Sequence, residues 1–418
     1  MKNKYSVCGI FFLILIGLGS LATISDWGFF GHRRINRMAV FTLPPDMMPI
    51  YKKNIDFLTD HAVDPDKRRY ATKHEAVRHY IDIDHWGTAP FDNVPRDWTE
   101  VLMKFTDVYL TRKPGDTLRI MGDDIVDFGE DELTLKSRRV LKRISSEPVI
   151  DKKAYKKFFR DYILPKYYED DWVLDCDAVK ELFEKTGLKY KCSSAFAKDR
   201  FSEYGILPYH MMVMQRRLTK AFEDQDVKKI LRLSAEFGHY IGDAHVPLHT
   251  TENYNGQLTD QVGIHGFWES RIPELFADAD WDYFVGKATY ISDPKEHYWD
   301  IILTSHSYLD SVLLIEKDLS QSFLEDKQFC YDERLQTTIR TQCKEYAAAY
   351  NQRMGGMVED RMQASILAIG SAWFTAWVDA GQPDLRKMTG FELTEVERKK
   401  QQEEEALFQG GAIKGREH

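Results

Sequence analysis

Two short segments of the chain carry a histidine and an acidic residue at the spacing of one helical turn. His239 is followed four residues later by Asp243, and His265 and Glu269 repeat this spacing. On a helix, residues four apart lie on the same face, so each pair can direct a nitrogen and an oxygen donor at one metal ion. Imidazole and carboxylate are ligands that zinc takes at about 2.0 to 2.2 Å. One such pair occurs often by chance, but two pairs in neighbouring segments predict a metal site.

The residues between the two pairs extend this prediction to a second ion. Pro247 should end the helix that carries the first pair, because proline cannot continue the helical hydrogen bonding. His249 can then turn toward another metal ion. His245 lies six residues from His239 and therefore off the ligand face, so we interpret it as a supporting or structural residue.

Further candidate donors lie nearer the N-terminus. Trp27-Gly-Phe-Phe-Gly-His32 is followed by Asp64, and fifteen residues later by His79-Tyr-Ile-Asp82. Taken alone, His32 would more often be a surface or capping residue than a ligand. It is the order of all these donors along the chain that favours a shared site.

That order resembles the superfamily of bacterial zinc-dependent phospholipases C and fungal single-strand-specific nucleases. The similarity runs from Trp27 to about Pro383, and its most specific part is the motif from His239 to His249. The resemblance implies a mostly helical, all-α, multi-helix domain of the phospholipase C/nuclease type. It also implies a phosphodiester hydrolase in which three zinc ions activate water for attack on phosphorus.

The resemblance assigns each donor to an ion. The first zinc would be held by Asp64, His79, His239 and Asp243, the second and more open one by His249, His265 and Glu269, and the third by Trp27, His32 and Asp243. Asp243 would thus bridge two ions. Asp66 is an alternative to Asp64, since that assignment depends on spacing. The resemblance also places Asp82 among the acids that support the ligands, and Tyr80 where an aromatic stacks on a base. Asp243, Asp82 and Asp64 are the acids to which we assign catalytic roles.

Two features depart from the pattern. Trp27 would have to be the first residue for its amine to bind zinc, yet Asp26 is a poor residue before a cleavage site. The stretch between His79 and His239 is also much longer than compact members of the superfamily need, which predicts an insertion at residues 86–202. This insertion could be a lid, a substrate selector or a partner surface.

The N-terminus has the layout of an export signal. Lys2 and Lys4 precede an uncharged stretch that continues to Ser25, so residues 1–26 are predicted to be a signal peptide, with a cut that the small-residue rule places after Ala22. The uncharged run is also long enough for an uncleaved membrane anchor. We therefore expect an exported protein, periplasmic or extracellular, and an anchor would associate it with a membrane through its N-terminus.

Four cysteines follow the signal, and four cysteines allow three pairings. We expect the pairing of neighbours, which would close two short loops; the alternative is four free thiols, which an oxidising compartment disfavours. The neighbouring pairs are Cys176 with Cys192 and Cys330 with Cys343.

Most of the chain has the periodicity of helices. Apolar residues recur at helical spacing over 207–245 and 341–380, the second stretch being interrupted near Gly355-Gly356 and stopped at Gly381, and convincing alternating strands are few. These elements should form one phosphodiesterase domain over residues 27–383. The tail at 384–418 is charged and predicts a solvated helix or disorder.

The composition limits the classes of substrate that the protein is expected to bind. The net charge of −9 argues against binding to duplex nucleic acid, which leaves a phospholipid or a single-stranded nucleic acid. Glu269 favours the phospholipid, because the nucleases more often carry aspartate at this position. A non-catalytic protein that uses zinc only for stability is the third hypothesis. The sequence indicates no protein partner.

Overall fold

The computed structural model describes residues 29–136, 148–184, 191–334, 337–388 and 394–409. The chain divides into two compact units. Met1–Ala76 and Met211–His418 form the first, which we call the helical unit, and Val77–His210 forms the second, the insertion unit. The insertion unit therefore begins and ends beyond the predicted boundaries of residues 86–202.

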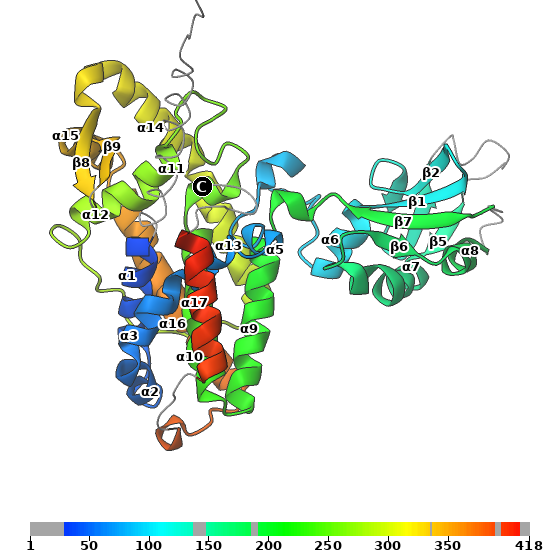
Figure 1. Ribbon diagram of the computed structural model, residues 1–418, viewed down its shortest axis with the longest axis horizontal. Helices are drawn as coiled ribbons and strands as arrows, with labels where there is room; N and C mark the ends of the chain where they lie inside the picture. The colour runs from blue at the N-terminus through cyan, green and yellow to red at the C-terminus, as the bar shows by residue number, and fades with distance from the viewer. Residues whose placement is uncertain (1–28, 137–147, 185–190, 335–336, 389–393, 410–418) are drawn as a thin grey trace, which may run out of the picture. The chain divides into compact units, whose positions relative to one another are not determined.

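Helices make up most of the helical unit, as the sequence predicts (Figure 1). They are α1 (Phe29–Ala39), α2 (Met48–Lys53), α3 (Ile55–Asp60), α4 (Asp64–Arg68), α5 (Lys73–Ala76), α10 (Val227–Ala244), α11 (Ile264–Gly266), α12 (Ile272–Phe276), α13 (Pro294–Ser307), α14 (Leu309–Ser322), α15 (Lys344–Arg353), α16 (Met357–Asp379) and α17 (Glu395–Gln409). Helix α9 (Leu207–Glu223) starts in the insertion unit and continues into this one. A hairpin of β8 (Phe329–Arg334) and β9 (Thr337–Gln342) precedes α15.

The two long stretches of helical periodicity are each divided in two. The first becomes α9 and α10, which are separated at Gln225, a residue with a positive φ of 52°. The second becomes α15 and α16, and the break falls at Gly355-Gly356 as expected. Because the first break comes before α10, the candidate ligands His239 and Asp243 lie on one uninterrupted helix.

Helix α10 is almost entirely buried over its second half, between α1 and α16. Gly238 is the reason that α1 can come so close: a Cβ at this position would overlap the side-chain oxygen of Asn36. Asn36 in turn donates a hydrogen bond from Nδ2 to the carbonyl of Ala235, at 2.8 Å. This contact fixes α1 against the helix that carries the candidate ligands.

A buried ion cluster holds α4 and α5 against α10. The guanidinium of Arg68 lies 2.8 Å from Glu236 Oε1 and 3.3 Å from Glu75 Oε2, and Tyr240 donates a hydrogen bond to Glu75. Burial alone would raise the pKa of Glu236, but the charges of Arg68 and Arg232 and their hydrogen bonds hold that pKa below its ordinary value. The cluster therefore contains an ionised carboxylate that stabilises the folded state at neutral pH.

Replacing Glu236 with glutamine should lower the free energy of unfolding by about 3 kcal/mol at pH 7, because it leaves buried arginine charge without its partner. Since the folded-state pKa is depressed, the contribution of the wild-type carboxylate is lost as the pH falls from about 4.3 through the lower folded value. The gap between wild type and Glu236→Gln should therefore shrink in urea unfolding at about pH 3.5. An equal gap at both pH values would contradict this account.

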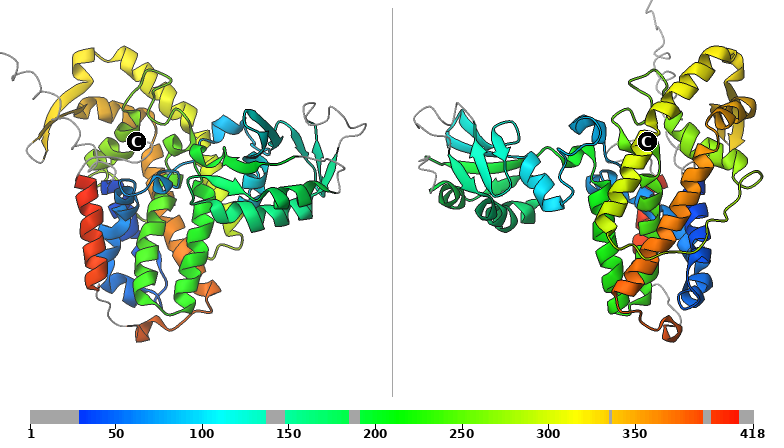
Figure 2. Two further views of the ribbon diagram at one scale, coloured as in Figure 1. Left: turned by 45° about the vertical axis from the view of Figure 1, so that its right-hand side comes forward. Right: turned by 180° about the vertical axis from the view of Figure 1, so that it is seen from behind.

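The insertion unit contains strands that the sequence analysis did not anticipate. Within its described part, the antiparallel order β2–β1–β7–β6 forms one sheet and β3–β4–β5 a second. The strands are β1 (Thr106–Lys113), β2 (Asp116–Met121), β3 (Val126–Phe128), β4 (Glu132–Leu135), β5 (Val149–Asp151), β6 (Trp172–Leu174) and β7 (Ser194–Asp199), and the helices are α6 (Trp98–Phe105), α7 (Lys152–Phe158) and α8 (Cys176–Glu184). Figure 2 shows α7 and α8 together on one side of the sheet. The mainly helical prediction therefore holds for the chain but not for this unit.

The pairing of neighbouring cysteines is confirmed. Cys176 is bonded to Cys192 in the insertion unit, and Cys330 to Cys343 in the helical unit, with Cα–Cα distances of 5.7 and 5.0 Å. Disulfides of this kind are typical of an oxidising, exported environment. None of the described helices is both long and apolar enough to cross a bilayer. The predicted signal or anchor at residues 1–26 lies outside the described residues.

Part of the charged tail is a helix that packs on the protein. Helix α17 lies against α4, where Glu405 forms an ion pair with Lys67 at 2.8 Å. The ring of Phe408 contacts the rings of Phe29 and Tyr70, with centroids 5.6 and 5.2 Å away. The predicted helix is therefore present at residues 395–409, but it is not wholly solvated, because Glu405 and Phe408 contact the helical unit.

Candidate metal centre

The last turn of α10 presents His239 and Asp243 on one face, as the four-residue spacing predicts. His239 Nε2 lies 3.3 Å from Asp243 Oδ2, and both side chains are buried. On the other side of the ring, His239 Nδ1 is 2.9 Å from the carbonyl of Ala62, in the turn that precedes α4. When a neutral ring donates Nδ1–H to this carbonyl, Nε2 is available as a metal ligand.

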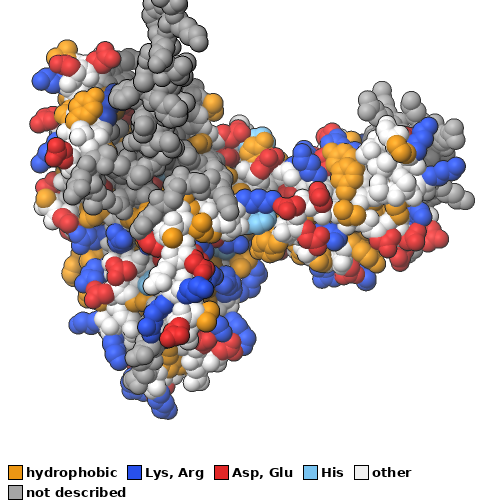
Figure 3. All heavy atoms as spheres, viewed as in Figure 1, with side chains coloured by type: hydrophobic (Ala, Val, Ile, Leu, Met, Phe, Trp, Pro, Cys, Tyr) orange, Lys and Arg blue, Asp and Glu red, His pale blue; other side chains and the backbone are white. Residues whose placement is uncertain are grey.

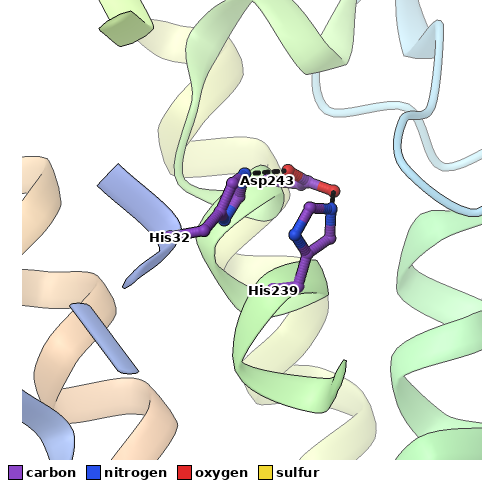
Figure 4. Close-up of side chains that lie close together, drawn as sticks. All are labelled: His32, His239 and Asp243. Carbon is purple, nitrogen blue, oxygen red and sulfur yellow. Dashed lines mark ion pairs between the residues drawn. The ribbon is translucent and has the colours of Figure 1, made fainter. Parts of the chain in front are cut away.

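His32 reaches the same carboxylate from α1 (Figure 4). Its Nε2 lies 3.3 Å from Asp243 Oδ1, and its ring stacks on that of His239 with centroids 3.8 Å apart. The two oxygens of Asp243 therefore face two different imidazoles. Ligand atoms of His32, His239 and Asp243 all lie within 4.8 Å of one another, a spacing that suits metal ions sharing Asp243.

A second group of donors comes from the segment after α10. His249 lies on a short helical turn that begins at Pro247, and His265 and Glu269 come from α11 and the single π-turn Phe267–Arg271 that follows it. Glu269 Oε2 lies 2.7 Å from His265 Nε2 and 3.4 Å from His249 Nε2. His265 Nδ1 is 3.0 Å from the carbonyl of Tyr254. His265 therefore resembles His239: its Nδ1 faces a backbone carbonyl and its Nε2 faces a carboxylate.

The two groups belong to one centre. Glu269 turns its other oxygen, Oε1, toward His32, at 3.5 Å from Nε2. His32 therefore lies between the carboxylates of Asp243 and Glu269. A row of imidazoles and shared carboxylates of this kind can hold several cations side by side.

Electrostatics keep both carboxylates in the form that binds cations. Burial alone would raise the pKa of Asp243, but the charges of His239 and His249 and hydrogen bonds from His239 and His32 hold that pKa well below its ordinary value. Glu269 follows the same pattern: burial opposes ionisation, and hydrogen bonds with His249, His265 and His32 lower the pKa well below normal. Both groups are ionised at neutral pH, as metal ligands must be.

The assignment of Asp64 needs a correction. Its Oδ2 lies 2.6 Å from His61 Nδ1, while Asp66 Oδ1 lies 3.6 Å from His239 Nε2. Two residues apart on a helix, the side chains point in different directions, and α4 turns Asp66 rather than Asp64 toward α10. Asp66, the alternative in the sequence analysis, is therefore the acidic donor that reaches His239.

The other predicted site residues lie in the insertion unit or outside the described residues. His79, Tyr80 and Asp82 lie in the insertion unit, in the segment before the turn at Ile83–Trp86. Within that unit the hydroxyl of Tyr80 donates to the carbonyl of Glu203, and the backbone N–H of Asp82 to the carbonyl of Tyr204. Their roles stay predictions. Trp27 lies outside the described residues.

Sequence reasoning missed the glycines that make the centre possible. A Cβ at Gly242 would lie 2.6 Å from Ile35 Cδ1 and 3.0 Å from His32 Nδ1, so only glycine lets His32 approach α10 here. Gly238, four residues earlier, admits Asn36 in the same way. Two glycines four residues apart on a buried helix face were the signal that could have revealed this contact.

Exchanging the two neighbouring aspartates for asparagine should separate their roles. Asp66→Asn removes a charged oxygen next to His239, so the protein should bind less zinc, with an affinity at least about tenfold lower. Asp64→Asn alters only the contact with His61 and should leave the zinc content unchanged. Metal analysis of the two purified variants measures this directly. A loss of zinc in Asp64→Asn alone would restore the original assignment.

No protein-family model matches the chain, and no curated protein is significantly similar to it. The geometry of this centre is therefore the main guide to function.

Proposed function

We propose that the chain is a zinc-dependent phosphodiester hydrolase similar in activity to phospholipase C. The observation that supports this most directly is the position of Asp243 between His32 and His239, with Glu269 forming the link to His249 and His265. Structural zinc sites are usually single and closed by four ligands. Carboxylates shared between neighbouring groups of ligands favour a catalytic centre with several ions.

The donor set fits zinc. Each of the imidazoles of His32, His239, His249 and His265 directs Nε2 toward a carboxylate. Two of them, His239 and His265, have Nδ1 at hydrogen-bonding distance from a backbone carbonyl, the usual support for a zinc-bound histidine. Neutral imidazole nitrogens and ionised carboxylates are the ligands that zinc prefers among common divalent ions.

The chemistry follows from the needs of a phosphodiester, whose negative charge repels nucleophiles. Zinc in such a centre lowers the pKa of water to about 7 and offsets the charge of the phosphate. The residues of this chain have positioning roles. Asp243 offers one oxygen to each side, which would fix the spacing between two cations, and the carbonyls of Ala62 and Tyr254 hold the rings of His239 and His265 in place.

Several residues are assigned to the proposed centre on the basis of the resemblance. His79 would complete the first ion site and Trp27 the third, while Asp82 would orient a ligand or a water. With Asp66 in place of Asp64, three ions per chain remain our expectation. His245 stays outside the ligand set, since its Nδ1 lies 2.7 Å from the carbonyl of Ile241 and burial lowers its pKa.

Phospholipid is the substrate that we favour, and single-stranded nucleic acid is the second candidate. Glu269 stands where the related nucleases more often have aspartate. Figure 3 shows Lys and Arg side chains interspersed with Asp and Glu over the visible face of the helical unit, rather than gathered in a basic band. Affinity for a nucleic acid backbone depends strongly on such basic surface.

The test compares the purified protein, loaded with zinc, on phosphatidylcholine and on single-stranded DNA. Release of phosphocholine and diacylglycerol, with little DNA cleavage, supports the phospholipase activity; the reverse supports the nuclease. His239→Ala should abolish either activity while the circular dichroism spectrum is preserved. Tight zinc binding without hydrolysis of any phosphodiester would overturn the proposal in favour of a zinc-stabilised binding protein.

A further inference from the structure

A small cavity of about 40 Å³ lies next to the metal centre, within the helical unit. Its lining includes His32, Gly242, Trp268 and Arg361. His32 borders it beside Gly242, where a Cβ would lie 3.0 Å from Nδ1 of the ring. A water molecule needs about 10 to 15 Å³ by this measure, so the cavity has room for a small ion and a water.

Two residues of the cavity wall each have a buried nitrogen without a hydrogen-bond partner. The indole nitrogen of Trp268 and Nδ1 of His32 are both buried, and neither has a hydrogen-bond partner among the described residues. The neighbouring rings of His239 and His265 differ, since their Nδ1 atoms have backbone carbonyls at 2.9 and 3.0 Å. Buried N–H groups are nearly always hydrogen-bonded. We therefore expect the cavity to hold a group that accepts a hydrogen bond from the indole N–H of Trp268 and, when Nδ1 carries the hydrogen, from His32.

Arg361 adds a positive charge to the same wall. It is only 7% exposed, and it donates from Nε to the carbonyl of His245 and from Nη2 to the hydroxyl of Ser305. No carboxylate lies within ion-pair distance of it in the described part of the chain, and burial lowers its pKa to about 10. A buried charge is normally balanced by an opposite one, so we also expect an anion next to this guanidinium.

We propose that this cavity binds a small monovalent anion of the size of chloride, held by the Arg361 guanidinium and the N–H groups of Trp268 and His32. An anion accepts from all three donors, whereas water would bring two hydrogens that need acceptors of their own. Glu269 also borders the cavity, but its oxygens are directed at His32 Nε2, His249 and His265. The roles of Trp268 and Arg361 are independent of the proposed function. The His32 contribution rests on it, because a ring that gives Nε2 to zinc keeps its hydrogen on Nδ1.

The bound anion would fix the orientation of the His32 ring by accepting a hydrogen bond from Nδ1. Nδ1 of a metal-binding histidine normally donates to a partner that fixes the ring, and such partners change metal affinity about 10- to 100-fold. In this protein the bound anion would take the place that the carbonyls of Ala62 and Tyr254 take for His239 and His265. Halide would then be a second ligand of the protein, distinct from zinc and substrate.

Crystals of the full chain grown or soaked in sodium bromide provide the first test. An anomalous bromide peak within hydrogen-bond distance of Trp268 Nε1 and the Arg361 guanidinium supports the proposal. Electron density for water alone, without anomalous signal at this position, overturns it. This result does not depend on activity, so it distinguishes a failure of the anion site from a failure of the proposed hydrolase.

Thermal unfolding provides the second test, in sodium chloride and in sodium gluconate at equal ionic strength. The wild-type melting temperature should be a few degrees higher in chloride, because an anion that binds only the folded state stabilises it. Arg361→Met and Trp268→Phe should lose this difference. Arg353→Met is the matched control, since Arg353 forms an exposed pair with Asp318. A chloride effect that survives in both cavity variants would contradict the site.

Discussion

Replacing Asp243 with asparagine should reduce the rate of phosphodiester hydrolysis by at least about a thousandfold, equivalent to about 4 kcal/mol of transition-state stabilisation. Asparagine has nearly the same shape, but it lacks the negative charge and one of the two oxygens that face His32 and His239 at 3.3 Å. Two cations could no longer share this side chain. The zinc content should fall together with the rate, and both are measured on the same purified protein.

Glu236→Gln is the matched control for this prediction. Glu236 is also a buried acid of α10, two turns earlier, and it pairs with Arg68 rather than with the metal centre. Its replacement should lower stability but leave the zinc content and the rate of the folded protein unchanged. Asp243→Asn with full zinc and full activity would contradict the role of Asp243 as a shared ligand.

Removal of zinc should lower the melting temperature by about 10 °C. A ligand present at a thousand times its dissociation constant stabilises a protein by about 4 kcal/mol, and a domain of this size shifts by about 2 to 4 °C for each kcal/mol. Without metal, the buried carboxylate of Asp243 and the partly buried carboxylate of Glu269 have imidazoles as their counter-charges, and Asp66 has His239 and Arg69. Calorimetry with and without a strong chelator, followed by zinc addition, measures the effect and its reversal.

The same experiment on variants shows where the effect originates. Asp243→Asn should respond weakly to the chelator, because most of its metal is already lost, whereas Asp64→Asn should respond like the wild type. Lower pH should also weaken the zinc effect, since protons compete with the metal for the imidazoles. A wild-type melting temperature that does not change with chelator would indicate that the centre holds no metal that stabilises the fold.

The part of the centre that could be predicted from the sequence is the part governed by local geometry. The spacing of His239 and Asp243 fixes their common face on any helix, and Pro247 forces the turn that brings in His249. Spacing alone could not decide whether Asp64 or Asp66 is the ligand, because the answer depends on how α4 is rotated about its axis. Its rotation is set by tertiary contacts, chiefly the ion pairs of Arg68 with Glu75 and Glu236.

The fold was predictable to a similar degree. The long helix α10 has a clear helical period, whereas β5 and β6 of the insertion unit have only three residues each and β1 lacks a regular alternation of burial. The docking of α17 was missed for a different reason. Its composition is that of a solvated helix, and a single aromatic residue near its end, Phe408, contacts Phe29 and Tyr70.

The backbone hydrogen bond between Ile206 N–H and the carbonyl of Val77, at 2.7 Å, joins the chain where it enters and leaves the insertion unit. A polypeptide that departs and returns at one point can gain, lose or exchange the intervening residues as a cassette, with no change in the path of the flanking helices. Because the N–H of Asp82 also donates to the carbonyl of Tyr204, a short glycine linker between these two residues would give a minimal version of the protein that keeps His79 and Asp82. The same junction is a natural place to graft a foreign domain whose own ends are equally close.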